Sequence, residues 1–154
     1  MEIRQARTKT EIEDVRRLFR EYESFLDVDL CFQSFEEELA GLPGKYTPPG
    51  GGLLIAVDGE RTVGCVAVRQ LSPEICEMKR LYVKPEARGT GLGRALARQI
   101  VETAKGIGYS KMRLDTLGKL RTARRIYTSM GFKETIPYYE NPIPGVVYME
   151  LALF

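Results

Sequence analysis

The sequence predicts an α+β fold, an α/β/α sandwich in which about four helices flank a mixed, mostly antiparallel sheet of six to seven strands. Two observations lead to this prediction. Apolar residues recur every three or four positions in four segments, which is the helical period, while the segments between them are short and rich in β-branched residues. Three of the strand-like segments, 53–57, 62–68 and 74–83, follow one another through short turns, which favours antiparallel pairing.

The N-terminal third contributes one strand and two helices. Residues 3–6 form the first strand, and the apolar positions between 12 and 26 form the first helix, which Thr8 or Thr10 can cap. A shorter helix is expected from Ser34 to Leu42, with Ser34 as its N-cap and Glu37 three residues later. With 154 residues the chain is expected to be a single domain, residues 1–154.

The strand 74–83 does not alternate cleanly between apolar and polar residues. Regular alternation places Glu77 and Lys79 on one face with Leu81, and Met78 and Arg80 together on the other. A β-bulge in this strand would reconcile the pattern. The remaining elements are then a helix at 91–107, a strand at 111–116, a helix at 120–130 and strands at 132–136 and 146–153.

A glycine-rich turn joins the strand 74–83 to the helix at 91–107. Glycines allow close approach of the backbone to a ligand, and the free N–H groups of a helix N-terminus attract an anion, so we expect a phosphate or pyrophosphate here. A Walker loop is excluded because neither Gly44-Lys45 nor Gly118-Lys119 continues with Ser or Thr. A dinucleotide fingerprint is excluded because the third glycine is missing, whether the pattern starts at Gly89 or Gly91.

The turn reads Arg88-Gly89-Thr90-Gly91-Leu92-Gly93, an R-x-x-G-x-G pattern that closely resembles the coenzyme A pyrophosphate loop of the GNAT superfamily of acyl-CoA-dependent N-acyltransferases. A second segment, Ile126–Phe132, resembles the Tyr-bearing helix end and Gly-Phe of the same family. The resemblance implies the GNAT fold, with the sheet splayed at the strand before the loop, and acetyl-CoA as cosubstrate without a metal.

Site residues follow from the resemblance. Glu77 is expected to be the general base, with Asp115 as second choice, and Tyr127 the general acid near the thioester sulfur. The alternative role of Glu77 is a surface ion pair with Lys79. The alternative role of Tyr127 is that of a packing residue in the core. The residues expected to bind coenzyme A are Leu81, Tyr82, Val83, Arg88, Gly89, Thr90, Gly91, Leu92, Gly93, Arg94 and Tyr127. Relatives often carry Asn where this chain has Leu120, so one pantetheine contact is expected to be lost or replaced.

The expected reaction is transfer of acetyl from acetyl-CoA to a primary amine by direct attack in a ternary complex. Two alternatives remain: a non-catalytic acyl-CoA-binding or sensing domain, and a transferase of a longer acyl group. The acceptor is left open among small amines, antibiotics, peptides and protein lysines, and a homodimer is also left open. From Glu21 to Gly44 there are seven acidic residues and no Lys or Arg, which form either a solvated helix face or a lip that attracts a cationic small molecule.

Composition excludes several other functions. The chain has no histidine, which removes histidine-based catalysis and histidine-rich metal sites, and its three cysteines match no metal or redox spacing. Cys65 and Cys76 fall on strands and are expected to be buried packing residues.

Residues 79–133 carry 14 basic and three acidic residues, but no nucleic-acid-binding motif accompanies them, so no nucleic acid is expected. The absence of a long apolar run or a signal peptide predicts a cytoplasmic protein without a membrane partner.

Overall fold

The computed structural model describes the backbone of residues 1–154 and every side chain except that of Phe32. Seven strands form one sheet in the order β1-β2-β3-β4-β5-β7-β6. The strands are β1 (Glu2–Gln5), β2 (Gly52–Asp58), β3 (Arg61–Gln70), β4 (Ile75–Val83), β5 (Lys111–Leu117), β6 (Lys133–Glu134) and β7 (Val146–Ala152). The helices are α1 (Lys9–Leu26), α2 (Phe35–Ala40), α3 (Leu92–Ile107) and α4 (Arg121–Ser129). The predicted fold class is therefore confirmed.

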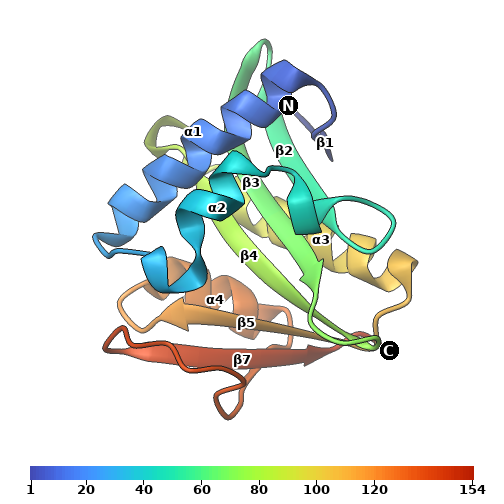
Figure 1. The fold of residues 1–154 in the computed structure, drawn as a ribbon, viewed down its shortest axis with the longest axis vertical. Coiled ribbons are helices and arrows are strands. Elements are labelled where there is room, and N and C mark those ends of the chain that lie inside the picture. Colours follow the sequence, from blue (N-terminus) through green and yellow to red (C-terminus); the bar gives the residue numbers. More distant parts are fainter.

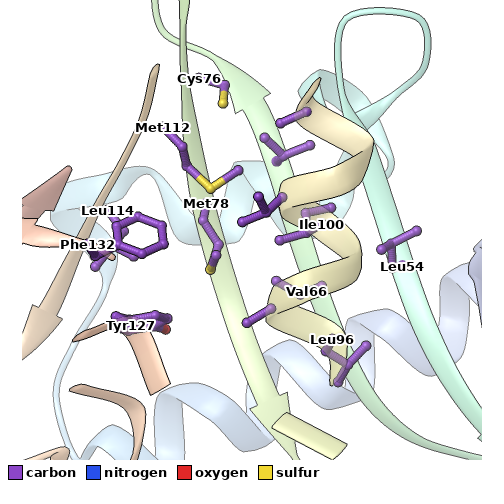
Figure 2. Close-up of a cluster of buried hydrophobic side chains, with 14 of the residues drawn as sticks. Leu54, Val66, Cys76, Met78, Leu96, Ile100, Met112, Leu114, Tyr127 and Phe132 are labelled. Atoms are coloured by element: carbon purple, nitrogen blue, oxygen red, sulfur yellow. The ribbon is translucent and has the colours of Figure 1, made fainter. Parts of the chain in front are cut away.

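Helices cover both faces of the sheet. Figure 1 shows α1 and α2 in front of the strands and α3 and α4 behind them. Alternate residues of β2 serve the two sides: Leu54 packs in the cluster under α3, and Leu53 and Ile55 in the cluster under α1 and α2. Figure 2 shows the α3-side cluster, in which Met78 and Met112 from neighbouring strands meet Ile100 of α3. Two apolar layers thus hold the sheet in a fixed position between the helices.

All neighbouring strands pair antiparallel except β4 and β5, which are parallel. Their ladder is short: Ile75 pairs with Lys111, and Glu77, opposite Arg113, is the last paired residue of β4 on this side. Beyond this point the two strands diverge, as Figure 1 shows. The backbone edge of β4 from Met78 onward is therefore free of a strand partner and can face a ligand.

The bulge predicted in β4 is present. Cys65 pairs with Tyr82 and Ala67 pairs with Lys79, so two residues of β4, Arg80 and Leu81, stand opposite a single residue of β3. Arg80 has a left-handed backbone, with φ of 61°. After the bulge the alternation is reversed, which places Tyr82 in the α1-side cluster and leaves Leu81 packed against the α3-side cluster. The extra residue explains why neither face of this strand was purely apolar in the sequence.

Several local predictions needed correction. The residue at the start of α2, Ser34, adopts a left-handed conformation with φ of 55° and its side chain caps nothing, so the predicted capping box with Glu37 is wrong. The capping box lies instead at the start of α1, where Thr8 and Glu11 exchange hydrogen bonds between side chain and backbone. The strand predicted over 132–136 is limited to Lys133–Glu134, because the chain leaves the sheet before the exposed Ile136.

Candidate functional site

A cavity of about 680 Å³ opens where β4 and β5 diverge. Its walls come from five places in the chain: the bulged part of β4, the end of β5, the glycine-rich loop, the start of α4 and the last turn of α1. Its side walls include Leu114 of β5 and both Tyr22 and Phe25 of α1. Elements distant in the sequence thus converge on one space next to the predicted anion site.

The glycine-rich loop has the geometry of an anion cradle. Gly89 and Gly91 have positive φ values of 79° and 83°, a region that side-chain-bearing residues avoid, and a Cβ at either position would point into open space. Gly91 is the N-cap of the 16-residue helix α3, so the free N–H groups of its first turn face this end of the cavity. A Cβ at Gly93 would make van der Waals contact with Ile126 of α4, at 3.4 Å.

The side chains around the loop have separate roles. Arg88 donates from Nε to the Val83 carbonyl at 2.9 Å, and its guanidinium stacks on Phe25 of α1, 4.6 Å from the ring centre. Thr90 does not line the cavity, because its hydroxyl donates to the Ala87 carbonyl at 2.7 Å. Arg94 lines the cavity and donates to the Ser129 hydroxyl. The loop's backbone is thus held in place by its own side chains.

Tyr127 of α4 lines the cavity, and its side chain also belongs to the α3-side cluster. Its ring packs edge-on against Phe132, with ring centres 5.7 Å apart, at one end of the cluster shown in Figure 2. Burial raises the pKa of the Tyr127 hydroxyl, so it stays protonated at neutral pH. Among the residues described by the structure, none forms a hydrogen bond with this hydroxyl. A protonated donor therefore faces the cavity.

Glu77 lies outside the cavity lining and is only 1% exposed. Both carboxylate oxygens are occupied: Arg69 donates from Nε to Oε1 at 2.8 Å, and the Tyr138 hydroxyl donates to Oε2 at 2.6 Å. The ammonium of Lys79 is 4.0 Å from Oε1. The predicted meeting of Glu77 and Tyr127 across one cleft is therefore not seen in this structure, where only Tyr127 reaches the cavity.

Asp115 of β5 does line the cavity. Its Oδ2 accepts hydrogen bonds from the Tyr139 hydroxyl and from Asn141 Nδ2, the latter at 2.8 Å. Burial, followed by the charge of Asp115, raises the pKa of the Tyr139 hydroxyl and keeps it a donor. Because both donors bind the same oxygen, Oδ1 of Asp115 has no bonded donor among the described residues and is available to a ligand.

Sequence reasoning did not identify Lys79 or Gln33 as site residues. Lys79 is one of the residues that line the cavity; its side chain is 8% exposed, and its ammonium donates to Gln33 Oε1 at 3.1 Å. Gln33 comes from the short helical turn Cys31–Gln33, and no pattern in the sequence marked it. The loop between β6 and β7 carries Tyr138 and Tyr139, whose hydroxyls donate to the two candidate carboxylates, Glu77 and Asp115.

Most carboxylates of the acidic stretch from Glu21 to Gly44 bind a partner within the chain. The engaged residues are Glu21 (with Lys84), Glu23 (with the Leu30 N–H), Asp29 (with the Cys31 N–H), Glu36 (with Arg20) and Glu38 (with Arg80). Five of the seven carboxylates thus stabilise local structure. This stretch offers little free negative charge to attract a cationic acceptor.

The sequence match to known families covers this site. Residues 49–134 match the acetyltransferase (GNAT) domain family. The chain belongs to the GNAT family of N-acetyltransferases. The matched part includes β4, the glycine-rich loop and Tyr127, whereas Gln33, Tyr138 and Tyr139 lie outside it. The match therefore covers the glycine-rich loop, Tyr127, Lys79 and Asp115, and leaves out the loops that carry Gln33, Tyr138 and Tyr139.

Relatives of this GNAT protein span most of its length. An uncharacterized N-acetyltransferase of Schizosaccharomyces pombe, C1271.07c, is 49% identical over 93% of this chain and 89% of its own. A GNAT-family acetyltransferase structure from Staphylococcus aureus superposes with a TM-score of 0.82 at 18% identity, over 99% of both chains. The structure of yncA from Salmonella typhimurium, a putative acetyltransferase with acetyl-CoA as its cofactor, superposes with a TM-score of 0.71 at 19% identity, over 100% of this chain and 94% of that one. These two structures support the fold.

The described residues contain no helix that is long and apolar enough to cross a membrane. Cys65 and Cys76 are fully buried, as expected of packing residues, and Cys31 is exposed.

Leu120 lines the cavity and packs against the α1-side cluster, so an apolar surface stands where many relatives carry Asn.

Proposed function

We propose that this protein transfers the acetyl group of acetyl-CoA to a primary amine by direct attack within a ternary complex. The observation that carries the proposal is the cavity at the splay of the sheet, which has the glycine-rich cradle at one end and a protonated tyrosine and a free carboxylate oxygen in its walls. Gly89, Gly91 and the first turn of α3 would hold the pyrophosphate. Arg121, which lines the cavity at the start of α4, would reach a phosphate of the same molecule.

The pantetheine arm and thioester would lie along the free edge of β4. The Lys84 N–H donates to Val63 of β3. Since successive N–H groups of a strand point to opposite edges, the Val83 N–H is directed toward the open side. We propose that a backbone N–H in the segment Leu81 to Val83, with that of Val83 directed to the open side, binds the arm or polarises the thioester carbonyl. The bulge at Arg80 supports this role because it keeps β5 from pairing with this edge.

Proton transfer is the chemical problem at neutral pH. An alkyl ammonium with a pKa near 10.4 is neutral in about one molecule in 10³ at pH 7, equivalent to roughly 4.6 kcal/mol at 1.36 kcal/mol per pKa unit. We propose that Asp115 accepts this proton, because it lines the cavity and its Oδ1 has no bonded donor among the described residues. Glu77 was the base predicted from the sequence. In this structure it could act only through the Tyr138 hydroxyl or after Tyr138 moves, because both of its oxygens are engaged.

The reaction can then be completed without a covalent enzyme intermediate. Asp115 first passes the ammonium proton on to solvent. The amine nitrogen then forms a bond to the thioester carbonyl carbon, the carbon–sulfur bond breaks, and the second proton of the nitrogen passes to Asp115, from which solvent returns it to the Tyr127 phenolate. The departing thiolate takes a proton from Tyr127, whose hydroxyl is kept protonated by burial. The cavity wall near Leu120 supplies the apolar surroundings in which these polar contacts are strong.

Coenzyme A release from acetyl-CoA over a panel of primary amines tests the proposal. We expect Tyr127→Phe and Asp115→Asn each to lower kcat by about 10²-fold, within the usual range for general acid–base catalysis. The matched control is Tyr109→Phe, which removes a buried hydroxyl that bonds to the Gly50 carbonyl away from the cavity. A larger loss in Glu77→Gln than in Asp115→Asn would return the base to Glu77. Coenzyme A binding by calorimetry without acetylation of any amine would indicate a binding domain instead.

A further inference from the structure

Charged residues cover part of the α1-side face of the sheet, in contrast to the apolar rest of that face. Register places Arg69, Glu77, Arg113 and Glu150 side by side on β3, β4, β5 and β7, and side chains of paired residues share a face. The signs alternate along this row. Arg69 bonds Glu77 and Arg113 bonds Glu150, both at 2.8 Å, so the row is internally compensated.

Lys79 and Asp115 lie one step further toward the cavity and both line it. They are not compensated in the same way. The Lys79 ammonium has three donors but forms one short hydrogen bond, to the neutral amide oxygen of Gln33 at 3.1 Å. The nearest carboxylate oxygen, on Glu77, is 4.0 Å away and already accepts a hydrogen bond from Arg69. An almost fully buried ammonium thus lacks a carboxylate of its own.

A chain of hydrogen bonds fixes Lys79 and Asp115 relative to each other. Lys79 donates to Gln33, Gln33 Nε2 donates to the Tyr139 hydroxyl at 2.8 Å, and Tyr139 donates to Asp115. Asn141 donates to the same Asp115 oxygen. The cavity therefore presents a positive and a negative group at one end, joined by neutral side chains, in a geometry that suits a ligand with one charge of each sign.

We propose that the acceptor is an amino acid, a primary amine that also bears a carboxylate, with the carboxylate bound by Lys79 and the amine by Asp115. This inference rests on the proposed acetyl transfer and names its substrate class. Burial, with the nearby charge of Arg80, lowers the pKa of Lys79 to about 8, as expected for an ammonium that waits for a counter-ion. Lys79 is then a specificity-determining residue. A cationic acceptor would instead place like charges close together in a site of low exposure.

Two matched sets of acceptors test this. Glycine, β-alanine, γ-aminobutyrate and aspartate are each compared with the corresponding amide, and the ratio of kcat/KM for acid over amide is measured. We expect Lys79→Gln to lower this ratio by about 30- to 100-fold, mostly through KM, because a hydrogen bond to a charged group contributes about 2–3 kcal/mol. Lys79→Arg, which keeps the charge, should restore part of the ratio. Lys111→Gln is the control, since Lys111 lies on the same face but outside the cavity lining.

Calorimetry of the same acids against the enzyme–coenzyme A complex provides a readout that does not need turnover. Binding that is present in wild type, lost in Lys79→Gln and kept in Lys111→Gln supports the site. Such binding without any acetyl transfer would refute the proposed function and keep the carboxylate site. The inference is wrong if wild type prefers the amides or polyamines, if no acid in the panel binds, or if Lys79→Gln leaves the ratio unchanged. Unfolding curves of Lys79→Gln exclude misfolding as the cause of a loss.

Discussion

The ion pair between Arg80 and Glu38 joins the bulge of β4 to helix α2, and its removal should be costly. Arg80 is 4% exposed and donates twice to Glu38, from Nε at 3.0 Å and from NH2 at 2.9 Å. Its guanidinium also stands 5.1 Å from the centre of the Phe35 ring. The substitution Arg80→Met keeps much of the volume and the same backbone φ of 61°, so it leaves the strain of the bulge unchanged. What remains is a carboxylate in a buried site without its partner.

Breaking one half of a buried ion pair typically costs about 3–5 kcal/mol, because the other charge loses its compensation. We therefore expect Arg80→Met to lower the free energy of unfolding by about 3 kcal/mol or more. The double variant Arg80→Met/Glu38→Leu removes both charges and should recover most of that loss, giving a coupling energy of about 2 kcal/mol or more. An exposed pair that also involves α2, Arg20 of α1 with Glu36, offers the control, and Arg20→Met should cost at most about 1 kcal/mol.

Urea denaturation followed by circular dichroism measures all four free energies at one pH and salt concentration. Raising the salt concentration should weaken the exposed pair more than the buried one. A stabilising role for the ion pair is refuted if Arg80→Met costs no more than Arg20→Met, or if the double variant is no more stable than Arg80→Met. The first result would mean that Arg80 adds no more stability than an exposed residue, and the second that Arg80 acts through contacts other than its ion pair with Glu38.

Two further predictions concern the anion cradle and the first helix. Gly91→Ala should weaken coenzyme A binding at least tenfold in calorimetry, because φ of 83° strains a side-chain-bearing residue by about 1–2 kcal/mol and relief of that strain would displace the N–H groups of the cradle. Gly59→Ala, at φ of 63° in a turn away from the cavity, should show the strain with unchanged binding. The N–H groups of Thr8 and then Arg7 lower the pKa of Glu11 to about 2, so its contribution to stability is complete above its ordinary pKa of 4.5 and is lost as the pH falls toward 2. The stability difference between wild type and Glu11→Gln, measured by urea denaturation from pH 7 to pH 2.5, should therefore shrink on acidification, and a constant difference would contradict the capping role.

Local patterns in the sequence were sufficient for the fold and for the geometry of the glycine-rich loop. The glycines at 89, 91 and 93 follow a strand and open a helix, and backbone geometry there depends on residue type alone, so the cradle could be predicted from spacing. The imperfect alternation of residues 74–83 likewise indicated a bulge before the register was known. Helix caps were less reliable, because whether Ser34 or Thr8 caps a helix depends on the backbone angle that the neighbouring chain imposes.

The acceptor half was decided only by the tertiary structure. Lys79 and Asp115 are 36 positions apart, and Gln33 and Tyr139 join them from two loops at opposite ends of the chain. No periodicity relates such residues, because their contact depends on where the two strands diverge and on how the loops fold over them. The same holds for Glu77, whose position in the strand suggested a free base and whose ion pair with Arg69 appears only once β3 and β4 are in register. Sequence thus determined the chemistry offered to coenzyme A, and the packing of distant segments determined which charges are left for the amine.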